Sequence, residues 1–211
     1  MVRERIAAAG GGERAITIVA VTKGFGADAA AAAVAAGLTD LGENYAAELE
    51  AKHHALSPSG PCRWHFLGRV QRRHVRRVAD AVHLWQAVDR VAAGEEIARR
   101  APGARVLVQV NVSGEEAKHG CRVAEAPVLV ESLAALGLDV RGLMAVGPLG
   151  PPERSRPGFR RLAALADELG LPERSMGMSA DLEVAVAEGS TMVRVGRALF
   201  GPRPQPGQLP H

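Results

Sequence analysis

Residues 16–42 read ITIVAVTKGFGADAAAAAVAAGLTDLG. The β-branched run Ile16–Thr22 predicts a strand, the alanine-rich run Asp28–Ala36 predicts a helix, and Thr39–Gly42 predicts a second strand. Gly37 follows the helical run, where a glycine commonly ends a helix. A helix between two strands is typical of a parallel sheet, so this stretch indicates an α/β protein.

The same alternation continues along the chain. Further strands are predicted at Arg63–Leu67, Ala81–Gln86, Arg105–Val112, Val140–Val146, Arg174–Met178 and Met192–Val195. Further helices are predicted at Tyr45–Leu56, Gln71–Ala79, Asp89–Arg100, Ala124–Leu136, Phe159–Leu169 and Ser179–Glu188, with Gly137, Gly170 and Gly189 as helix ends. An open doubly wound sheet and a closed (β/α)8 TIM barrel both fit this alternation, and eight strand–helix units favour the barrel.

Length and composition predict a single domain. The chain has 211 residues, 47% of them apolar, which is enough for one core. We expect the barrel to occupy residues 1–201, with a short helix at the N-terminus, a loop at 147–158 and a flexible tail at 202–211. No run approaches the roughly 20 apolar residues of a membrane span, and the N-terminus does not resemble a signal peptide. Cys62 and Cys121 lack metal-ligand spacing, so a reduced cytosol is the simplest compartment.

Lysine is rare in this arginine-rich chain. Of the 26 basic residues, the lysines are Lys23, Lys52 and Lys118. Only lysine can form a Schiff base with a carbonyl compound, which raises the question of what Lys23 does at the end of a strand. Composition alone favours the simpler explanation, a general bias toward arginine and alanine that leaves three lysines by chance.

Functional residues of a β/α barrel gather at the carboxyl ends of its strands. The predicted strands bring the following residues to those ends: Lys23, Asn44, His65, Asn111, Met144, Ser175–Ser179, Arg194 and Gly196. An amine at the end of a buried strand is partly desolvated, which lowers its pKa, as carbonyl condensation requires. The alternative is a solvated surface lysine at the start of a loop.

The last two predicted strand–helix connections form a candidate phosphate site. Ser179 is placed to cap the helix that follows it, and Gly196 with the backbone of Arg197 offers further N–H donors. Phosphate binding by the last loops of a barrel is a recurrent arrangement. Taken singly, Ser179 could be an ordinary N-cap and Arg194 a surface ion pair. Their position at adjacent strand ends favours the phosphate site.

A basic run spans Arg69–Arg77. It could bind nucleic acid, but with few aromatic residues available for stacking we interpret it as a solvated outer helix face. No pair of His or Cys residues has metal-ligand spacing.

Eight motifs in order resemble one protein family. They are Val19-Ala-Val-Thr-Lys23, Gly42-Glu-Asn-Tyr45, Trp64-His-Phe-Leu-Gly68, Val108-Gln-Val-Asn-Val-Ser113, Lys118-His-Gly120, Arg141-Gly-Leu-Met144, Ser175-Met-Gly-Met-Ser179 and Gly189-Ser-Thr-Met-Val-Arg-Val-Gly196. From about residue 5 to residue 201, the chain resembles the pyridoxal phosphate homeostasis protein family, also called the YggS/PROSC family.

This resemblance implies a barrel similar to the N-terminal domain of alanine racemase, with pyridoxal 5′-phosphate (PLP) as cofactor. Lys23 would carry PLP as a Schiff base, and Arg194 would face the pyridine nitrogen. The phosphate would lie against Ser179, Gly196 and the main chain at Arg197. The resemblance also implies that three further residues line the cofactor: Asn44, His65 and Met144.

The resemblance further implies a carrier of intracellular PLP and not an enzyme. An arginine at the pyridine nitrogen keeps that nitrogen unprotonated, which makes the ring a poor electron sink. Tyr45, the one tyrosine, belongs to the Gly-Glu-Asn-Tyr motif, so no second acid–base partner is evident. The alternative is a weak PLP-dependent racemase-type enzyme. We expect a cytoplasmic monomer that serves PLP-dependent apoenzymes and binds neither membranes nor nucleic acid.

The chain departs from the family pattern at three places. The usual Lys-Thr-Lys is Lys23-Gly24-Phe25, so a second basic residue near the mouth is missing. The usual Leu-Gln-x-Asn-Lys is Val70-Gln-Arg-Arg-His74. The usual Gly-Thr-x-x-Phe-Gly is Gly196-Arg-Ala-Leu-Phe-Gly201, so Arg197 replaces a hydroxyl that could bind phosphate, which could strengthen or weaken binding.

Overall fold

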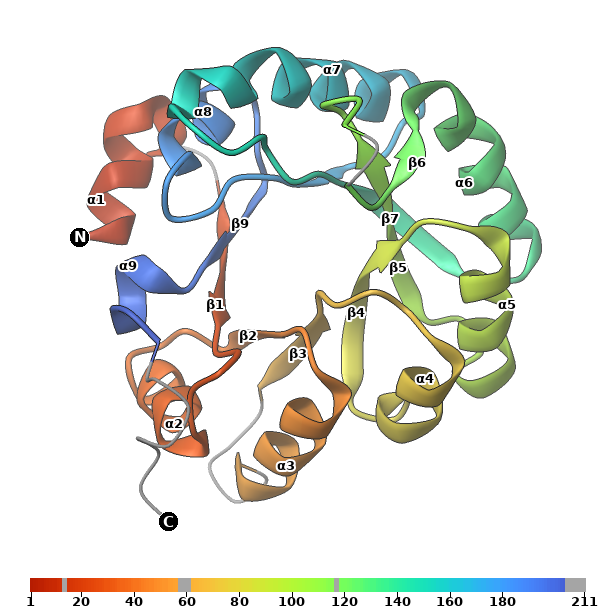
Figure 1. Cartoon of the computed structure of the whole chain (residues 1–211), viewed down its shortest axis with the longest axis horizontal. Coiled ribbons are helices and arrows are strands. Elements are labelled where there is room, and N and C mark those ends of the chain that lie inside the picture. Colours follow the sequence, from red (N-terminus) through yellow and green to blue (C-terminus); the bar gives the residue numbers. More distant parts are fainter. Residues whose placement is uncertain (13–14, 57–61, 116–117, 204–211) are drawn as a thin grey trace.

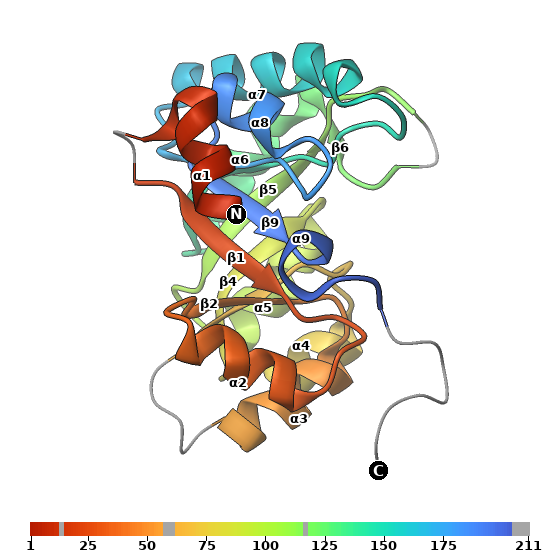
Figure 2. The ribbon, with the colours of Figure 1, turned by 90° about the vertical axis from the view of Figure 1, so that its left-hand side faces the viewer.

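The strands form a closed parallel barrel. A computed structural model describes residues 1–12, 15–56, 62–115 and 118–203. Figure 1 shows the ring of strands with helices around it, and Figure 2 shows the same ribbon from the side. The ring consists of β1 (Thr17–Val21), β2 (Asp40–Glu43), β3 (Arg63–Phe66), β4 (Val82–Val88), β5 (Arg105–Asn111), β7 (Asp139–Met144), β8 (Glu173–Ser175) and β9 (Met192–Val195). The pairings β1–β9 and β4–β5 close it, which confirms the predicted barrel.

The helices follow the predicted order. They are α1 (Val2–Ile6), α2 (Ala27–Ala35), α3 (Ala46–Leu56), α4 (Arg72–Val78), α5 (Val91–Arg100), α6 (Ala126–Ala135), α7 (Arg156–Glu168), α8 (Leu182–Ala187) and α9 (Arg197–Phe200), with π-helical turn η1 (Ala7–Gly11) and 3-10 turns η3 (Val123–Glu125) and η4 (Pro152–Ser155). The four glycines predicted to end helices all have positive φ values, between 65° and 91°. Glycine adopts this conformation without steric cost, so these predicted ends are confirmed.

Several elements differ from the prediction, and one of them, the short helix α9, lies where no helix was predicted. The two-residue strand β6 (Cys121–Arg122), which pairs with β5, is too short for a periodic signal. Helix α7 begins at Arg156, inside the predicted loop 147–158, because Pro157 suits a first helical turn. Helix α8 begins at Leu182 with Asp181 at its N-cap position, so the prediction that Ser179 caps this helix is wrong.

Side chains of the strands alternate between two buried regions. Ala20 packs with Ala30 and Ala33 of α2, in the layer between strands and helices. Its neighbour Val19 therefore points into the barrel, where it belongs to a smaller apolar cluster with Leu107 and other side chains. The barrel interior also contains buried polar groups, among them Gln86, Ser175 and Arg194.

Other predicted features concern the surface and the tail. Among the described residues, no helix is long and apolar enough to cross a membrane. Within the same ranges, no group of three or more His, Cys, Asp or Glu residues could hold a metal ion. Cys62 and Cys121 are free thiols. Most of the predicted flexible tail, residues 204–211, lies outside the described residues.

Candidate functional site

Lys23 lies just beyond the carboxyl end of β1 and is half-buried. No hydrogen bond joins its Nζ to another described residue. Burial lowers the pKa of Lys23, the nearby guanidinium groups of Arg203 and Arg194 lower it further, and Glu43 opposes the shift. A larger neutral fraction makes this amine a better nucleophile.

The backbone on both sides of Lys23 is held by side chains of α3. Lys52 Nζ donates to Thr22 O at 2.8 Å, and the Gly24 N–H donates to Glu48 Oε2 at 2.8 Å. Lys52 and Glu48 are four residues apart, so both can reach the strand from one helix face. Sequence reasoning missed this pair, although the Glu–Lys spacing in the helix after Gly42-Glu-Asn44 was a usable signal.

Glu43 completes this arrangement from the end of β2. Its Oε1 accepts from Lys52 Nζ at 2.5 Å and from Thr22 Oγ1 at 2.7 Å. Its Oε2 is buried without a hydrogen-bond partner among the described residues. Burial raises the pKa of Glu43, although the hydrogen bonds from Lys52 and Thr22 act against this shift. Glu43 was likewise not among the predicted site residues.

Arg194 lies inside the barrel, on β9. Its side chain is buried, and Nη1 donates to Ser175 O and Ser175 Oγ, both at 2.7 Å. Nη2 donates to Ala145 O at 2.7 Å. Burial lowers the pKa of Arg194 to about 10, and the charge of Asp181 opposes this shift. The surface ion pair considered for Arg194 is therefore wrong.

Lys23 and Arg194 are brought together by the pairing of β1 with β9. Val19 is the register partner of Arg194, and Ala20 is the partner of Val195. One residue further along, a Cβ on Gly196 would lie 3.1 Å from Val21 O. Because both strands run in one direction, Lys23 and the loop after Gly196 lie at the same mouth of the barrel.

The predicted phosphate-site residues also meet at this mouth. Ser179 Oγ accepts from the Ala198 N–H at 3.1 Å, which holds the loop after β8 against the first turn of α9. Asp181 fixes this loop further, since its Oδ1 accepts from the Met178 N–H at 2.7 Å. The side chain of Arg197 is exposed. Ser179 therefore connects two loops, which explains its position better than a helix cap does.

Asn44, Met144 and His65 occupy three different environments. A Cβ on Gly68 would lie 2.0 Å from Asn44 O, so the loops after β2 and β3 touch only because residue 68 is glycine. Met144 is buried in the apolar cluster inside the barrel. His65 is buried and hydrogen-bonded through Nε2 to Asp40 Oδ1 at 2.9 Å. Since Asp40 begins β2, this bond directs His65 toward the amino end of the barrel.

Asn111 and Arg203 also bear on the mouth. Asn111 Nδ2 donates to Glu115 O at 2.9 Å, so Asn111 folds the loop after β5. A cavity of about 230 Å³ beside this loop is lined by Gln109, Lys118 and His119, among others.

Arg203 lies close to the backbone that follows Lys23. A Cβ on Gly24 would lie 3.2 Å from Arg203 Cδ. Arg203 thus supplies a cation near Lys23, which the motif Lys23-Gly24-Phe25 had suggested was missing.

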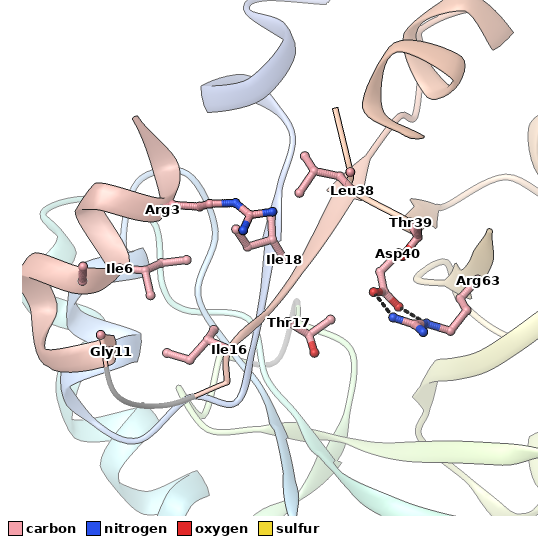
Figure 3. A pocket seen from close by; sticks show the side chains of 13 residues that line it. Arg3, Ile6, Gly11, Ile16, Thr17, Ile18, Leu38, Thr39, Asp40 and Arg63 are labelled. Atoms are coloured by element: carbon pink, nitrogen blue, oxygen red, sulfur yellow. Dashed lines mark hydrogen bonds and ion pairs between the residues drawn. The ribbon is translucent and has the colours of Figure 1, made fainter. Parts of the chain in front are cut away.

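A larger cavity, of about 440 Å³, lies at the opposite end of the barrel. Figure 3 shows its lining, which includes Arg3 of α1, Thr17 at the start of β1, and the ion pair between Asp40 and Arg63. All three strand residues begin their strands. This cavity is therefore separate from the mouth that holds Lys23.

The basic run was interpreted as a solvated helix face. Arg77 Nε lies 2.5 Å from Glu50 Oε2, and Arg72 Nε lies 3.5 Å from Glu96 Oε2. Val75 and Val78 of the same helix are buried, as the predicted face requires. Part of the basic charge is therefore compensated by carboxylates of neighbouring helices.

Comparison with known proteins places the chain in a family. The family model "Alanine racemase, N-terminal domain" matches residues 3–204. The "Pyridoxal phosphate homeostasis protein" of Pseudomonas aeruginosa is 40% identical over 210 residues, which are 96% of this chain and 91% of that protein.

Two solved structures share the fold along nearly the whole chain. A protein of unknown function from Bifidobacterium adolescentis has a TM-score of 0.87 and 34% identity, covering 94% of this chain and 91% of that one. PipY of Synechococcus elongatus PCC7942, solved with PLP bound, has a TM-score of 0.83 and 31% identity, covering 95% and 100%. The chain belongs to the pyridoxal phosphate homeostasis protein family.

Proposed function

We propose that this protein binds PLP through a Schiff base on Lys23 and takes part in PLP homeostasis in the cytoplasm. The observation that carries the proposal is the meeting of Lys23, an amine without a hydrogen-bond partner among the described residues, with the buried donor Arg194 at one mouth. The names of the relatives and the PLP in PipY support the choice of ligand.

The residues at this mouth suit the parts of PLP. The aldehyde of PLP condenses with an amine, and Lys23 has the lowered pKa that this condensation requires. Arg194 would donate to the pyridine nitrogen, since its Nη atoms are engaged by Ser175 and Ala145 while its Nε donates to none of the described residues. Ser179, Gly196 and the main chain at Arg197 would hold the phosphate, where the Ser179 hydroxyl proton remains available to donate.

Three residues would then shape the pocket around the ring. Met144 would supply an apolar surface, and Asn44 would line the mouth from the loop after β2. His65 would contribute from the amino-end side of the pocket, because its hydrogen bond to Asp40 directs it toward the amino end of the barrel. We therefore expect substitutions at Met144 and Asn44 to change PLP affinity directly.

We further propose that the protein carries PLP and does not turn over a substrate. Arg194 would keep the pyridine nitrogen unprotonated, and such a ring stabilises carbanions poorly. The one tyrosine, Tyr45, is 57% exposed at the start of α3. We likewise propose that it is a monomer that delivers PLP to apoenzymes and binds neither membranes nor nucleic acid.

Absorption spectroscopy tests the binding proposal. The purified protein should turn yellow on addition of PLP, and borohydride should fix PLP to the peptide that contains Lys23. A protein that stays colourless with excess PLP, or that carries the label at another lysine, would contradict the proposal.

The alternative is a weak racemase-type enzyme, which the match to the alanine racemase domain favours. Single-enantiomer amino acids incubated with the PLP-loaded protein in deuterated water distinguish the two functions. We expect no exchange at Cα above the rate with free PLP. Exchange at rates ordinary for enzymes would contradict the carrier function and support a racemase-type enzyme.

A further inference from the structure

A chain of hydrogen bonds runs through the barrel interior and ends at Arg194. Ser175 Oγ accepts from Arg194 Nη1 at 2.7 Å and donates to Gln86 Oε1 at 2.6 Å. Gln86 Nε2 lies 2.7 Å from His65 Nδ1 and donates to Met192 Sδ at 3.0 Å. Gln86 and Ser175 are fully buried. The interior of such a barrel is usually filled with branched apolar side chains, so this polar chain needs an explanation.

The chain continues from His65 to the other end of the barrel. His65 Nε2 lies 2.9 Å from Asp40 Oδ1, and Asp40 pairs with Arg63, whose side chain is 52% exposed beside the cavity of Figure 3. Burial acts to raise the pKa of Asp40, but hydrogen bonds from Arg63 and His65 outweigh it and hold the pKa well below its usual value. Asp40 is therefore a permanent acceptor at neutral pH.

The directions of the hydrogen bonds in this chain can be assigned by starting from Arg194. Arg194 can only donate, so Ser175 Oγ accepts from it and gives its single proton to Gln86 Oε1. The Gln86 amide then turns Nε2 toward His65 Nδ1, which must accept. At the other side of the ring, His65 Nε2 donates to Asp40 Oδ1, because the Asp40 carboxylate can only accept. Turning the Gln86 amide around would place two donors on Ser175 Oγ and remove the bond to Met192 Sδ.

We propose that Gln86 and His65 are positioning residues for Arg194, because together they fix the Ser175 hydroxyl and thereby the orientation of the guanidinium toward the PLP ring. This inference rests on the proposed binding of PLP at Arg194. Neither residue needs to touch PLP. Both act through Ser175, which provides two of the three acceptors of Arg194.

The experiment begins with wild-type protein, in which PLP uptake tests the proposed function. If that protein binds PLP, the Gln86→Met variant tests the inference, since methionine has a similar size but neither accepts from Ser175 nor donates to His65. We expect PLP to bind about tenfold more weakly to Gln86→Met and the visible absorption band of the bound PLP to shift. An unchanged band and affinity would overturn the inference.

Two His65 variants separate positioning from packing. His65→Asn keeps an acceptor near the position of Nδ1, whereas His65→Leu removes it. We expect His65→Asn to restore most of the wild-type band and affinity, and His65→Leu to behave like Gln86→Met. Equal spectra for the two His65 variants would contradict the positioning role. Leu133→Ala is the control for lost stability, because it opens a cavity at α6, away from the mouth. This variant should leave the absorption band of bound PLP in place.

A double-mutant cycle shows whether Gln86 acts through Arg194. In the Arg194→Ala background, Gln86→Met should cause no further change in the band or in PLP affinity. Additive changes would mean that Gln86 acts by another route. Nitrogen-15 NMR of the PLP-free wild-type protein provides a readout without cofactor: the proton of His65 should lie on Nε2, and a proton on Nδ1 would overturn the assigned direction of the chain.

Discussion

Lys23 and Lys52 lie near the same short piece of backbone, but their surroundings differ sharply. Thr22, the residue before Lys23, donates through its hydroxyl to Glu43 and accepts from Lys52 at its carbonyl oxygen. Lys52 is 4% exposed and donates to three acceptors. Lys23 is more exposed, yet it has no acceptor among the described residues and its pKa is lowered.

This difference shows that depth of burial does not by itself make a lysine reactive. A buried amine can instead be engaged by carboxylates, as the Lys52 amine is by Glu43 and Glu48. Lys23 lacks such a partner among the described residues, so burial lowers its pKa, the cations Arg203 and Arg194 lower it further, and the amine has a weaker hold on its proton. Lys52 thus has a structural role, whereas Lys23 is suited to react with a carbonyl group.

The largest expected effect is the loss of covalent PLP attachment when Lys23 is substituted. Lys23→Ala should abolish covalent attachment of PLP after borohydride reduction, because the amine of Lys52 is engaged in an ion pair. Mass spectrometry of the intact, reduced protein measures the loss. The matched control is Lys118→Ala, which removes a lysine paired with Glu115 and should keep the full adduct. An adduct on Lys52 in the Lys23→Ala protein would show that the two amines do not differ as described.

The next largest effect concerns Lys52. Lys52→Met leaves Glu43 buried without its cation, which should lower the free energy of unfolding by about 3–5 kcal/mol. The double variant Lys52→Met/Glu43→Leu should recover most of this loss, because it leaves neither charge behind. Urea denaturation measures both values. If the double variant were no more stable than Lys52→Met, Glu43 would not carry the uncompensated charge.

A smaller effect appears in the pH dependence of stability. Since burial lowers the pKa of Lys23, the folded state binds fewer protons than the unfolded chain between that lowered pKa and the ordinary value of 10.5. The stability of PLP-free protein therefore gains a contribution that rises with pH through this window. The free energy of unfolding of Lys23→Met should exceed that of wild type by the largest amount at neutral pH. This difference should shrink as the pH approaches 10.5. Urea titrations at several pH values test this trend, and a difference independent of pH would contradict it.

The smallest effect refines the electrostatics of Lys23. Arg203→Ala removes a cation that lowers the pKa of Lys23, so this pKa should rise slightly. The pH dependence of Lys23 labelling by an amine reagent measures it. Arg161→Ala on α7, which removes a charge from an exposed site, should leave the labelling curve unchanged. A lower pKa in Arg203→Ala would reverse the assigned sign.

Most of the barrel could be predicted because its periodicity is local. Each of the eight ring strands overlaps a predicted run, and the positive φ values of Gly37 and Gly170 agree with their assignment as helix ends. β6 could not be predicted, because two residues carry no pattern. The start of α8 was misplaced because Ser179 and Asp181 are both good capping residues, and only the contact of Ser179 with Ala198 distinguishes them.

The site was predictable in part, for a related reason. Lys23 and Arg194 follow from strand ends and motifs, but the partners of Arg194 do not. Gln86 and Ser175 are 89 residues apart in sequence, and only the closed ring brings them together. Glu43 was hidden because its neighbours in β2 gave the strand an ordinary appearance, while its partner Lys52 belongs to the following helix.

The pairing of β1 with β9 also has a consequence for biosynthesis. Lys23 leaves the ribosome well before Arg194, which belongs to the last strand of the ring, and Gly196, which follows that strand. Until then β1 lacks β9 as its neighbour, and the incomplete barrel has no Arg194 side chain to donate to a pyridine nitrogen. In the proposed PLP site, a polypeptide that lacks β9 would therefore have the amine of Lys23 but not the guanidinium of Arg194, so the site can form only after β9 has been translated.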